Sequence, residues 1–379
     1  MVSFYLDLNI KSPSHVTILI WIKKLGIYRL AQPKEKADDW IVMIDESIEF
    51  GHDKLLVILG IREAHIDFKT CLHYEQMTCL KLAVSSSWKG DEIKEVLEEL
   101  VLQIGKIKYV VADMGNPIKK ALRLASLPHI EDITHKISWF IKELYKEDVH
   151  FKSYTEKLAH LRGILGLSNM SHILPPRQRS HSRFMNLKPV FGWGVAVLKM
   201  LESDTANPAE RERMLFVREY EALITQTYEL ITIAHQIQGI LKNNGLSVTT
   251  MEACLKLFEN VSGQRILLFK DMIEVFLMGK LKMMEGKSKQ ILCTSDILES
   301  SFGKYKGYIS DNISVGITDL SLSIPAFSGK LNGDEIVKAM EGVKVEQIKK
   351  WSASNIGQTQ LKKRRESLKM GGRKKMKSP

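Results

Sequence analysis

Two apolar runs that each end in an aspartate constrain the fold of this chain more than any other feature. The first run is Trp40–Ile44, followed by Asp45, and the second is Lys108–Ala112, followed by Asp113. Continuous apolar runs of this length with polar flanks are typical of strands buried on both faces of a sheet. Because each acid closes its strand at the same end relative to chain direction, the pattern predicts a buried sheet with a paired acidic edge.

Further segments complete an order of strands and helices around these two runs. Lys54–Gly60 and Leu80–Ser85 are two more predicted strands, and 128–133 is a short fifth. Helices with apolar residues three and four apart are predicted at 91–104, 116–125 and 135–144. The order β-β-β-α-β-α-β-α predicts an α/β fold, with a mixed five-stranded sheet and helices on both faces.

Strand signals vanish between about 150 and 289. Apolar residues recur at helical spacing through 209–243, and 251–261 and 266–284 fit further helices. This stretch therefore predicts an all-α insertion in the sheet domain.

The predicted organisation has five segments. They are a helical segment (1–37), the first part of the sheet domain (38–149), the helical insertion (150–289), the last part of the sheet domain (290–325), and short helices with a basic disordered tail (326–379). A helix is expected at 12–26, with Ser12 as its N-cap and Gly26 as its stop. It is either part of a truncated helix-turn-helix that binds DNA or a packing helix.

The formal net charge of +11 favours a polyanionic partner, either nucleic acid or an anionic membrane surface. Nine Lys or Arg and one acid lie in 361–379, so the rest of the chain carries only about +3. The tail fits a DNA-binding segment and a solvated end equally well.

Several other classes find no support in the sequence. The four cysteines match no zinc or disulfide pattern, and no apolar stretch reaches the ~18 residues of a membrane span. Gly286-Lys287-Ser288 suggests a phosphate-binding loop, but position 281 is Leu where that loop has Gly. We therefore expect a cytoplasmic protein with no membrane partner and no nucleotide cofactor.

Asp45 and Asp113 repel each other if they lie side by side, and a cation relieves that repulsion. Oxygen ligands suit Mg²⁺ or Mn²⁺, and two such ions can clamp a scissile phosphate. A third carboxylate is expected from a helix beside the first strand, where Glu299 is the candidate. Asp296 is its competitor, because it lies three residues earlier on the same helical face.

Four short segments together resemble one known family. They are 44–47, 111–115, 132–136 and 295–306, and over residues 38–310 the chain resembles the bacterial insertion-sequence transposases of the DDE class. The resemblance implies an RNase H-like catalytic domain whose metal ligands are Asp45, Asp113 and Glu299. It also implies two-metal cleavage at transposon ends and strand transfer into target DNA. The interval of 186 residues from Asp113 to Glu299 fits the separate domain that some of these enzymes insert there.

Auxiliary roles follow from the same resemblance and from charge. His135 either contacts the scissile phosphate or only caps its helix start, and Lys304 and Lys306 would face a phosphate backbone. Trp193 either stacks on a flipped base or packs in the core. The basic run of Arg177, Arg179, His181 and Arg183 either binds phosphate or is a solvated loop.

Two other functions remain open on the sequence. One is an RNase H-like nuclease or resolvase without strand transfer, and the other is a non-catalytic DNA-binding remnant of a transposase. If the transposase hypothesis holds, the protein would have to form a homodimer or a larger assembly to pair two transposon ends on DNA.

Overall fold

The computed structural model describes residues 12–48, 53–70, 72–178, 183–203, 207–309 and 316–375. The chain divides into two compact units. Unit 1 comprises the described residues of Met1–Asp67, Leu72–His129 and Ser295–Pro379, and unit 2 comprises those of Phe68–Cys71 and Ile130–Thr294. The boundaries expected at 150 and 289 both fall inside unit 2.

The sheet has five strands, which are β1 (Ala37–Ile48), β2 (Lys54–Arg62), β3 (Thr78–Ser85), β4 (Gly105–Ala112) and β5 (His129–Glu131). Their order across the sheet is β3-β2-β1-β4-β5. β2 is antiparallel to both β1 and β3, whereas β4 is parallel to β1. This mixed order is that of the RNase H-like fold, so the predicted fold class is confirmed.

The central strands are buried on both faces because their sequences are continuously apolar. Ile41–Ile44 of β1 and Leu55–Leu59 of β2 are fully buried. Trp40, Val42 and Ile44 belong to a core cluster shared with α3 (Gly90–Ile104) and α4 (Asn116–Leu124). The odd-numbered residues of β1 face the other side, since successive side chains alternate across a sheet.

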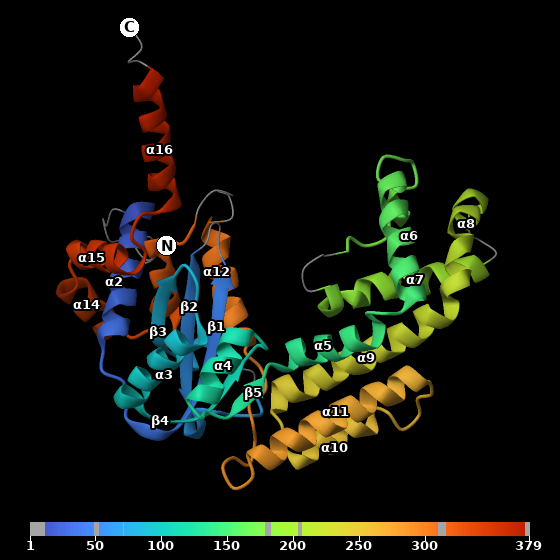
Figure 1. The fold of residues 1–379 in the computed structure, drawn as a ribbon, viewed down its shortest axis with the longest axis horizontal. Helices are drawn as coiled ribbons and strands as arrows, with labels where there is room; N and C mark the ends of the chain where they lie inside the picture. The colour runs from blue at the N-terminus through green and yellow to red at the C-terminus, as the bar shows by residue number, and fades with distance from the viewer. Residues whose placement is uncertain are drawn as a thin grey trace, which may run out of the picture. The chain divides into compact units, whose positions relative to one another are not determined.

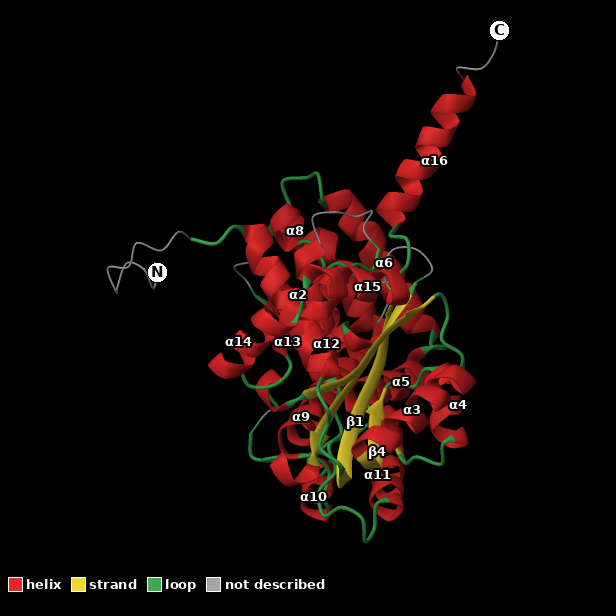
Figure 2. Cartoon of the chain, turned by 90° about the vertical axis from the view of Figure 1, so that its left-hand side faces the viewer, coloured by secondary structure: helices red, strands yellow, loops and turns green. Residues whose placement is uncertain are grey.

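Helices cover both faces of the sheet, as predicted. α3 and α4 lie on one side, and α12 (Asp296–Ile309) and α13 (Ser323–Phe327) lie on the other (Figure 2). α12 contacts β1 and α13 contacts β3. The edge strand β3 is partly covered, because the Cys79 amide donates to Ser328 Oγ at 3.2 Å.

The N-terminal helix α2 (His15–Ala31) differs from the expected helix at both ends. Ser14, not Ser12, is the N-cap, and its hydroxyl accepts from the Thr17 amide. The helix also continues past Gly26. A Cβ at Gly26 would lie 2.1 Å from the Leu322 carbonyl oxygen, so no larger residue fits there. Gly26 therefore permits a close helix approach and does not end the helix, which sequence spacing alone cannot distinguish.

α2 packs against the C-terminal part of unit 1. Its partners are η6 (Asp319–Leu322), α13, α14 (Gly333–Gly342) and α15 (Val345–Asn355). η6 and α13 lie after α12 in the chain, and their Leu322, Ile324 and Ala326 are buried. Within unit 1, α2 serves as a packing helix.

Arg29 of α2 holds this contact together, although it is only 8% exposed. Its guanidinium donates to the Glu335 carboxylate through Nε (2.9 Å) and Nη2 (2.6 Å). It also donates to the backbone carbonyls of Ala326, Ser328, Gly329 and Lys330. A buried arginine with this many acceptors is fully compensated, so Arg29 ties α2 to the C-terminal part of unit 1.

The basic tail is helical where we expected disorder. α16 (Gln360–Lys375) begins after Thr359, whose backbone carbonyl accepts from the Lys363 amide at 3.0 Å. Its described side chains, from 361 to 369, are exposed. The prediction of disorder was based on the mutual repulsion of the cations. The charge pattern alone does not show whether the backbone forms local hydrogen bonds.

Unit 2 is built mainly of helices (Figure 1). They are α5 (Ile133–Tyr145), α6 (Val149–Leu165), η3 (Ser171–Ile173), η4 (Arg183–Met185), α7 (Leu187–Glu202), α8 (Pro208–Met214), η5 (Leu215–Tyr220), α9 (Glu221–Asn244), α10 (Val248–Lys256) and α11 (Gln264–Met283). Unit 2 begins before α5 because that helix packs on α9 and α11. Among the described residues, no helix is long and apolar enough to cross a membrane.

Replacing Arg29 with Met should lower the free energy of unfolding of the protein by about 3 kcal/mol, because Glu335 and several carbonyls lose their donor. Urea denaturation followed by tryptophan fluorescence measures this. Arg123→Met is the matched control, because Arg123 is exposed on α4. Equal losses in the two variants would contradict the assigned role of Arg29.

A second prediction concerns acid stability. Burial raises the pKa of Asp39, but hydrogen bonds from Arg62 and the Ala64 amide outweigh it, so the pKa is lowered overall. A carboxyl whose pKa is lower in the folded state stabilises the fold above its unfolded pKa of about 4. That stability is lost as the pH falls through the lower folded pKa.

Asp39→Asn should therefore cost about 1 kcal/mol at neutral pH and weaken the pH dependence of stability below about pH 4. Urea midpoints measured across the acid range test both effects. Asp38→Asn is the control, since Asp38 is an exposed neighbour on the same strand. An unchanged acid limb in Asp39→Asn would refute the assignment.

Candidate active site

Asp45 and Asp113 lie next to each other because of the parallel register of β1 and β4. This register pairs Met43 with Val111 and Ile44 with Ala112, and the two aspartates are the next residues in their chains. Neighbouring strands lie about 4.8 Å apart, so the two acids start from adjacent backbone positions. The structure thus places these two predicted site residues together at one end of the sheet.

Side-chain alternation also puts the two acids on the same face. Asp45 follows Ile41 and Met43 at two-residue steps, and Asp113 follows Tyr109 and Val111 in the same way. The intervening residues of both strands belong to the core under α3 and α4. The acidic pair is therefore on the opposite face of the sheet, the one that α12 covers.

Each aspartate is positioned by a local backbone hydrogen bond. Asp45 Oδ1 accepts from the Glu46 amide at 2.7 Å, and Asp113 Oδ1 accepts from the Gly115 amide at 2.8 Å. A Cβ at Gly115 would lie 3.0 Å from Asp113 Oδ1, which is a tight contact. Gly115 thus allows the turn before α4 to hold the carboxylate, and the sequence signal for it is its place in the Val111–Gly115 motif.

Glu46 is a separate acidic residue. Its Oε1 accepts from Lys54 Nζ at 2.6 Å across the β1–β2 pair. Its Oε2 is buried and has no hydrogen-bond partner among the described residues. Because strand neighbours point to opposite faces, Glu46 is directed away from the face that carries the aspartate pair.

α12 is anchored on the sheet as its sequence predicts. Leu298, Phe302 and Tyr305 are buried, and the helix contacts β1. Asp296 is the first residue of α12 and is half-buried, whereas Glu299 is exposed. Leu298, Phe302 and Tyr305 therefore anchor the helix.

The structure does not bring a third carboxylate to the aspartate pair. Within the described part of the chain, no three His, Cys, Asp or Glu side chains gather closely enough to hold a metal ion. The two aspartates alone are hard oxygen donors at one edge, and this donor set fits Mg²⁺ or Mn²⁺. Glu299 and Asp296 are carried by α12, which contacts β1.

The lysines of α12 have different environments. Lys304 Nζ lies 4.7 Å from the centroid of the Tyr74 ring, in cation–π geometry. Burial raises the pKa of Tyr74 well above its ordinary value, which keeps this ring neutral. The side chain of Lys306 lies outside the described residues. Lys304 thus has a contact within the protein that the sequence does not indicate.

His135 lies in the first turn of α5, in unit 2. Its amide donates to Asp132 Oδ1 at 3.1 Å, and the Thr134 amide donates to the same oxygen at 2.9 Å. Asp132 is 1% exposed, so this buried carboxylate is the N-cap of α5. The backbone amide of His135 therefore takes part in helix capping.

The predicted DNA-contacting residues of unit 2 are only partly described. Arg177 is exposed, Arg179 and His181 lie outside the described residues, and Arg183 lies in η4 without a described side chain. Trp193 is half-buried within α7, and its Nε1 donates to the Ile173 carbonyl at 3.2 Å. The indole is therefore held by η3.

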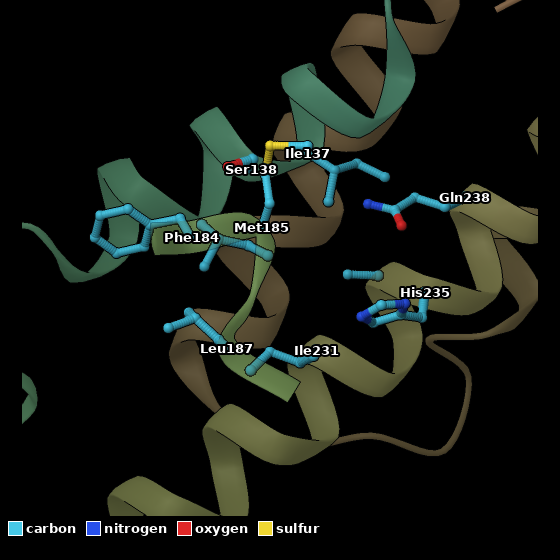
Figure 3. A pocket seen from close by; sticks show the side chains of 10 residues that line it. Ile137, Ser138, Phe184, Met185, Leu187, Ile231, His235 and Gln238 are labelled. Carbon is cyan, nitrogen blue, oxygen red and sulfur yellow. The ribbon is translucent and has the colours of Figure 1, made fainter. Parts of the chain in front are cut away.

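A small pocket in unit 2 is lined by α5, η4 and α9 (Figure 3). His235 and Gln238 of α9 line it opposite Ser138 of α5. Its volume of about 10 Å³ is close to that of a single water site, so the pocket is a packing gap. Partial burial lowers the pKa of His235, and the nearby positive charges of Lys188 and Lys242 lower it further. The sequence does not indicate this lowered pKa.

Comparison with known proteins gives a structural similarity but no match by sequence family. No protein-family model and no curated protein matches the chain. The chain is similar to a solved structure of the Drosophila P element transposase strand transfer complex, with a TM-score of 0.42 and 10% sequence identity. The similarity covers 88% of this chain and 89% of that chain. The fold assignment rests on the strand order and register of this chain itself.

Proposed function

We propose that this protein is a DDE-type transposase that cuts DNA and joins it to a target at the Asp45–Asp113 edge. The observation that carries the proposal is the parallel register of β1 and β4, which places Asp45 of β1 beside Asp113, the residue after β4, on one face of the sheet. An RNase H-like sheet with two such carboxylates is suited to phosphodiester chemistry. The resemblance of its motifs to bacterial insertion-sequence transposases agrees with this function.

In this proposal Asp45 and Asp113 hold two Mg²⁺ or Mn²⁺ ions. Bound ions would lower the pKa of an attacking water and stabilise the leaving 3′ oxygen. The protein supplies two carboxylates in fixed positions, because backbone amides bind one oxygen of each. Pre-positioned ligands reduce the reorganisation needed when metal and DNA bind.

Glu299 is the proposed third ligand. Its helix contacts β1, and its exposed side chain is not locked by core packing. A change of rotamer would bring Glu299 to the pair when cations and DNA arrive. Asp296, one turn earlier, is the alternative third ligand.

DNA is the proposed substrate, in the form of transposon ends and target DNA. The net charge of +11 favours a polyanion. Exposed Arg177 and the side of α12 that carries Lys304 are the proposed backbone contacts. Because two transposon ends must be paired, we propose that the active form is a homodimer or a larger assembly on DNA.

Cation binding provides the first test. Mn²⁺ should raise the melting temperature of the wild-type protein, because a ligand that binds only the folded state stabilises it by mass action. Asp45→Asn and Asp113→Asn should each remove that shift, and Asp38→Asn, at the other end of β1, should keep it. A shift of the same size in all four proteins would contradict a cation site at the pair.

DNA cleavage provides the second test. Labelled duplexes from the DNA flanking the coding sequence are incubated with protein and Mg²⁺ or Mn²⁺. We expect metal-dependent nicking that falls by about two orders of magnitude or more in Asp45→Asn, Asp113→Asn and Glu299→Gln. Asp38→Asn is again the control and should cleave like wild type.

Other outcomes reassign the function in defined ways. Loss of cleavage in Asp296→Asn but not in Glu299→Gln would make Asp296 the third ligand. Cleavage without joining to target DNA would identify a nuclease or resolvase. No cleavage in any protein, with salt-sensitive DNA binding retained, would overturn the proposal and identify a non-catalytic DNA-binding protein.

A further inference from the structure

The helix α16 carries a dense positive charge that the proposed active site does not use. Lys362, Lys363, Arg364, Arg365 and Lys369 are all exposed along its described part. The one acid among them, Glu366, accepts a hydrogen bond from Gln358 at 3.3 Å. Figure 1 shows α16 following α15 within unit 1 as a helix that projects from it.

Among the described residues, the cations of α16 form no salt bridge. The salt bridges of unit 1 use other residues, such as Arg29 with Glu335 and Lys23 with Asp319. The five cations of α16 therefore repel one another and remain available to an external anion. A helix with this charge density is stabilised when its cations are neutralised.

The cations also have a geometry suited to a duplex. Lys362, Arg365 and Lys369 are spaced three and four residues apart, so they share one helical face. At 1.5 Å per residue they span about 10 Å of helix. Lys363 and Arg364 flank this face on both sides, so the helix can contact phosphates on either wall of a groove about 12 Å wide.

We propose that α16 binds the sugar-phosphate backbone of duplex DNA, through the basic face formed by Lys362, Arg365 and Lys369 with Lys363 and Arg364 at its sides. The contact is made with phosphates and does not read sequence, because lysine and arginine neutralise phosphates without distinguishing bases. α16 would hold a DNA duplex to unit 1 independently of the acidic edge.

Duplex DNA fits this helix better than a membrane surface. Helices that lie in a membrane interface need a broad apolar face opposite their cations. In α16 the exposed apolar side chains of the described part are Leu361 and Leu368, which lie seven residues apart. Two leucines form only a narrow strip, whereas the cations occupy most of the remaining circumference.

This inference deepens the proposed function, because it adds a contact for the DNA on which that function rests. The two remain separable by experiment. Binding through α16 needs no divalent cation, whereas the proposed cleavage needs both cation and acidic pair. The α16 contact is therefore measured in EDTA, with the Asp45→Asn protein as a second background.

The test measures binding of the full chain to a random-sequence DNA duplex by fluorescence anisotropy across a range of salt concentrations. The variant carries Lys362→Gln, Lys363→Gln, Arg365→Gln and Lys369→Gln, which keep good helix formers in place. We expect at least about a tenfold loss of affinity, and a slope of log K against log salt that is smaller by about 2 to 4.

The matched control removes four charges from the opposite part of unit 1. Lys89, Lys106, Lys119 and Arg123 are exposed on or beside α3 and α4, and their replacement by Gln should change the slope much less. Hydrogen exchange gives a second readout, because DNA should slow exchange of the amides of 361–369 in the wild-type chain.

Equal affinity and slope in the α16 variant and in wild type would overturn the proposal. So would loss of binding to vesicles that contain phosphatidylserine without any loss of DNA binding. If the α16 variant loses DNA binding while no protein cleaves DNA, this proposal stands and the catalytic one fails. If it cleaves and binds like wild type, the catalytic proposal stands and this one fails.

Discussion

The parallel pairing of β1 with β4 is the interaction on which the rest of unit 1 depends. It buries continuous apolar runs on both faces, and it also places Asp45 of β1 beside Asp113, the residue that follows β4. A shift of this register by one residue would put Ala112 beside Asp45 and turn one carboxylate toward the core under α3 and α4. Core packing therefore fixes the geometry of the acidic pair, because the buried side chains tolerate only one register.

The second constraint is the closure of unit 1 by its own chain ends. The sheet face that carries the aspartates is covered by α12 and α13, and α13 is tied to α2 through Arg29. Since α12 follows unit 2 in the chain, its place on β1 depends on an element that folds back from more than 180 residues beyond β4. The strands of the sheet precede the helices of unit 2 in the chain, and the helices that cover the aspartate face follow them. The fold can therefore accept a large helical unit at that point.

The parts of the structure that depend on local sequence patterns could be predicted. The continuous runs ending at Asp45 and Asp113 predict buried strands, and their order predicts the mixed sheet that the structure has. The role of a residue could not be predicted where it depends on a contact with a residue distant in the sequence. Gly26 has the pattern of a helix stop, but the carbonyl of Leu322 determines its role. The partners of Arg29 and Lys304 are likewise set by tertiary packing, and neither has a signal in its own segment.

The candidate site likewise has one part that local patterns predict and one part that they do not. The aspartate pair was predictable because both residues belong to strands whose register follows from burial. The proposed third ligand was not, because α12 carries Asp296 and Glu299 one turn apart, and in the described part of the chain neither joins the pair in a group that could hold a metal ion. An acidic edge within a basic molecule also has a physical consequence. The net charge attracts a polyanion to the whole surface, whereas the two aspartates repel it locally unless cations are bound. In the proposed mechanism, productive approach of a phosphate to that edge is therefore coupled to cation binding, which restricts cleavage to the metal-loaded protein.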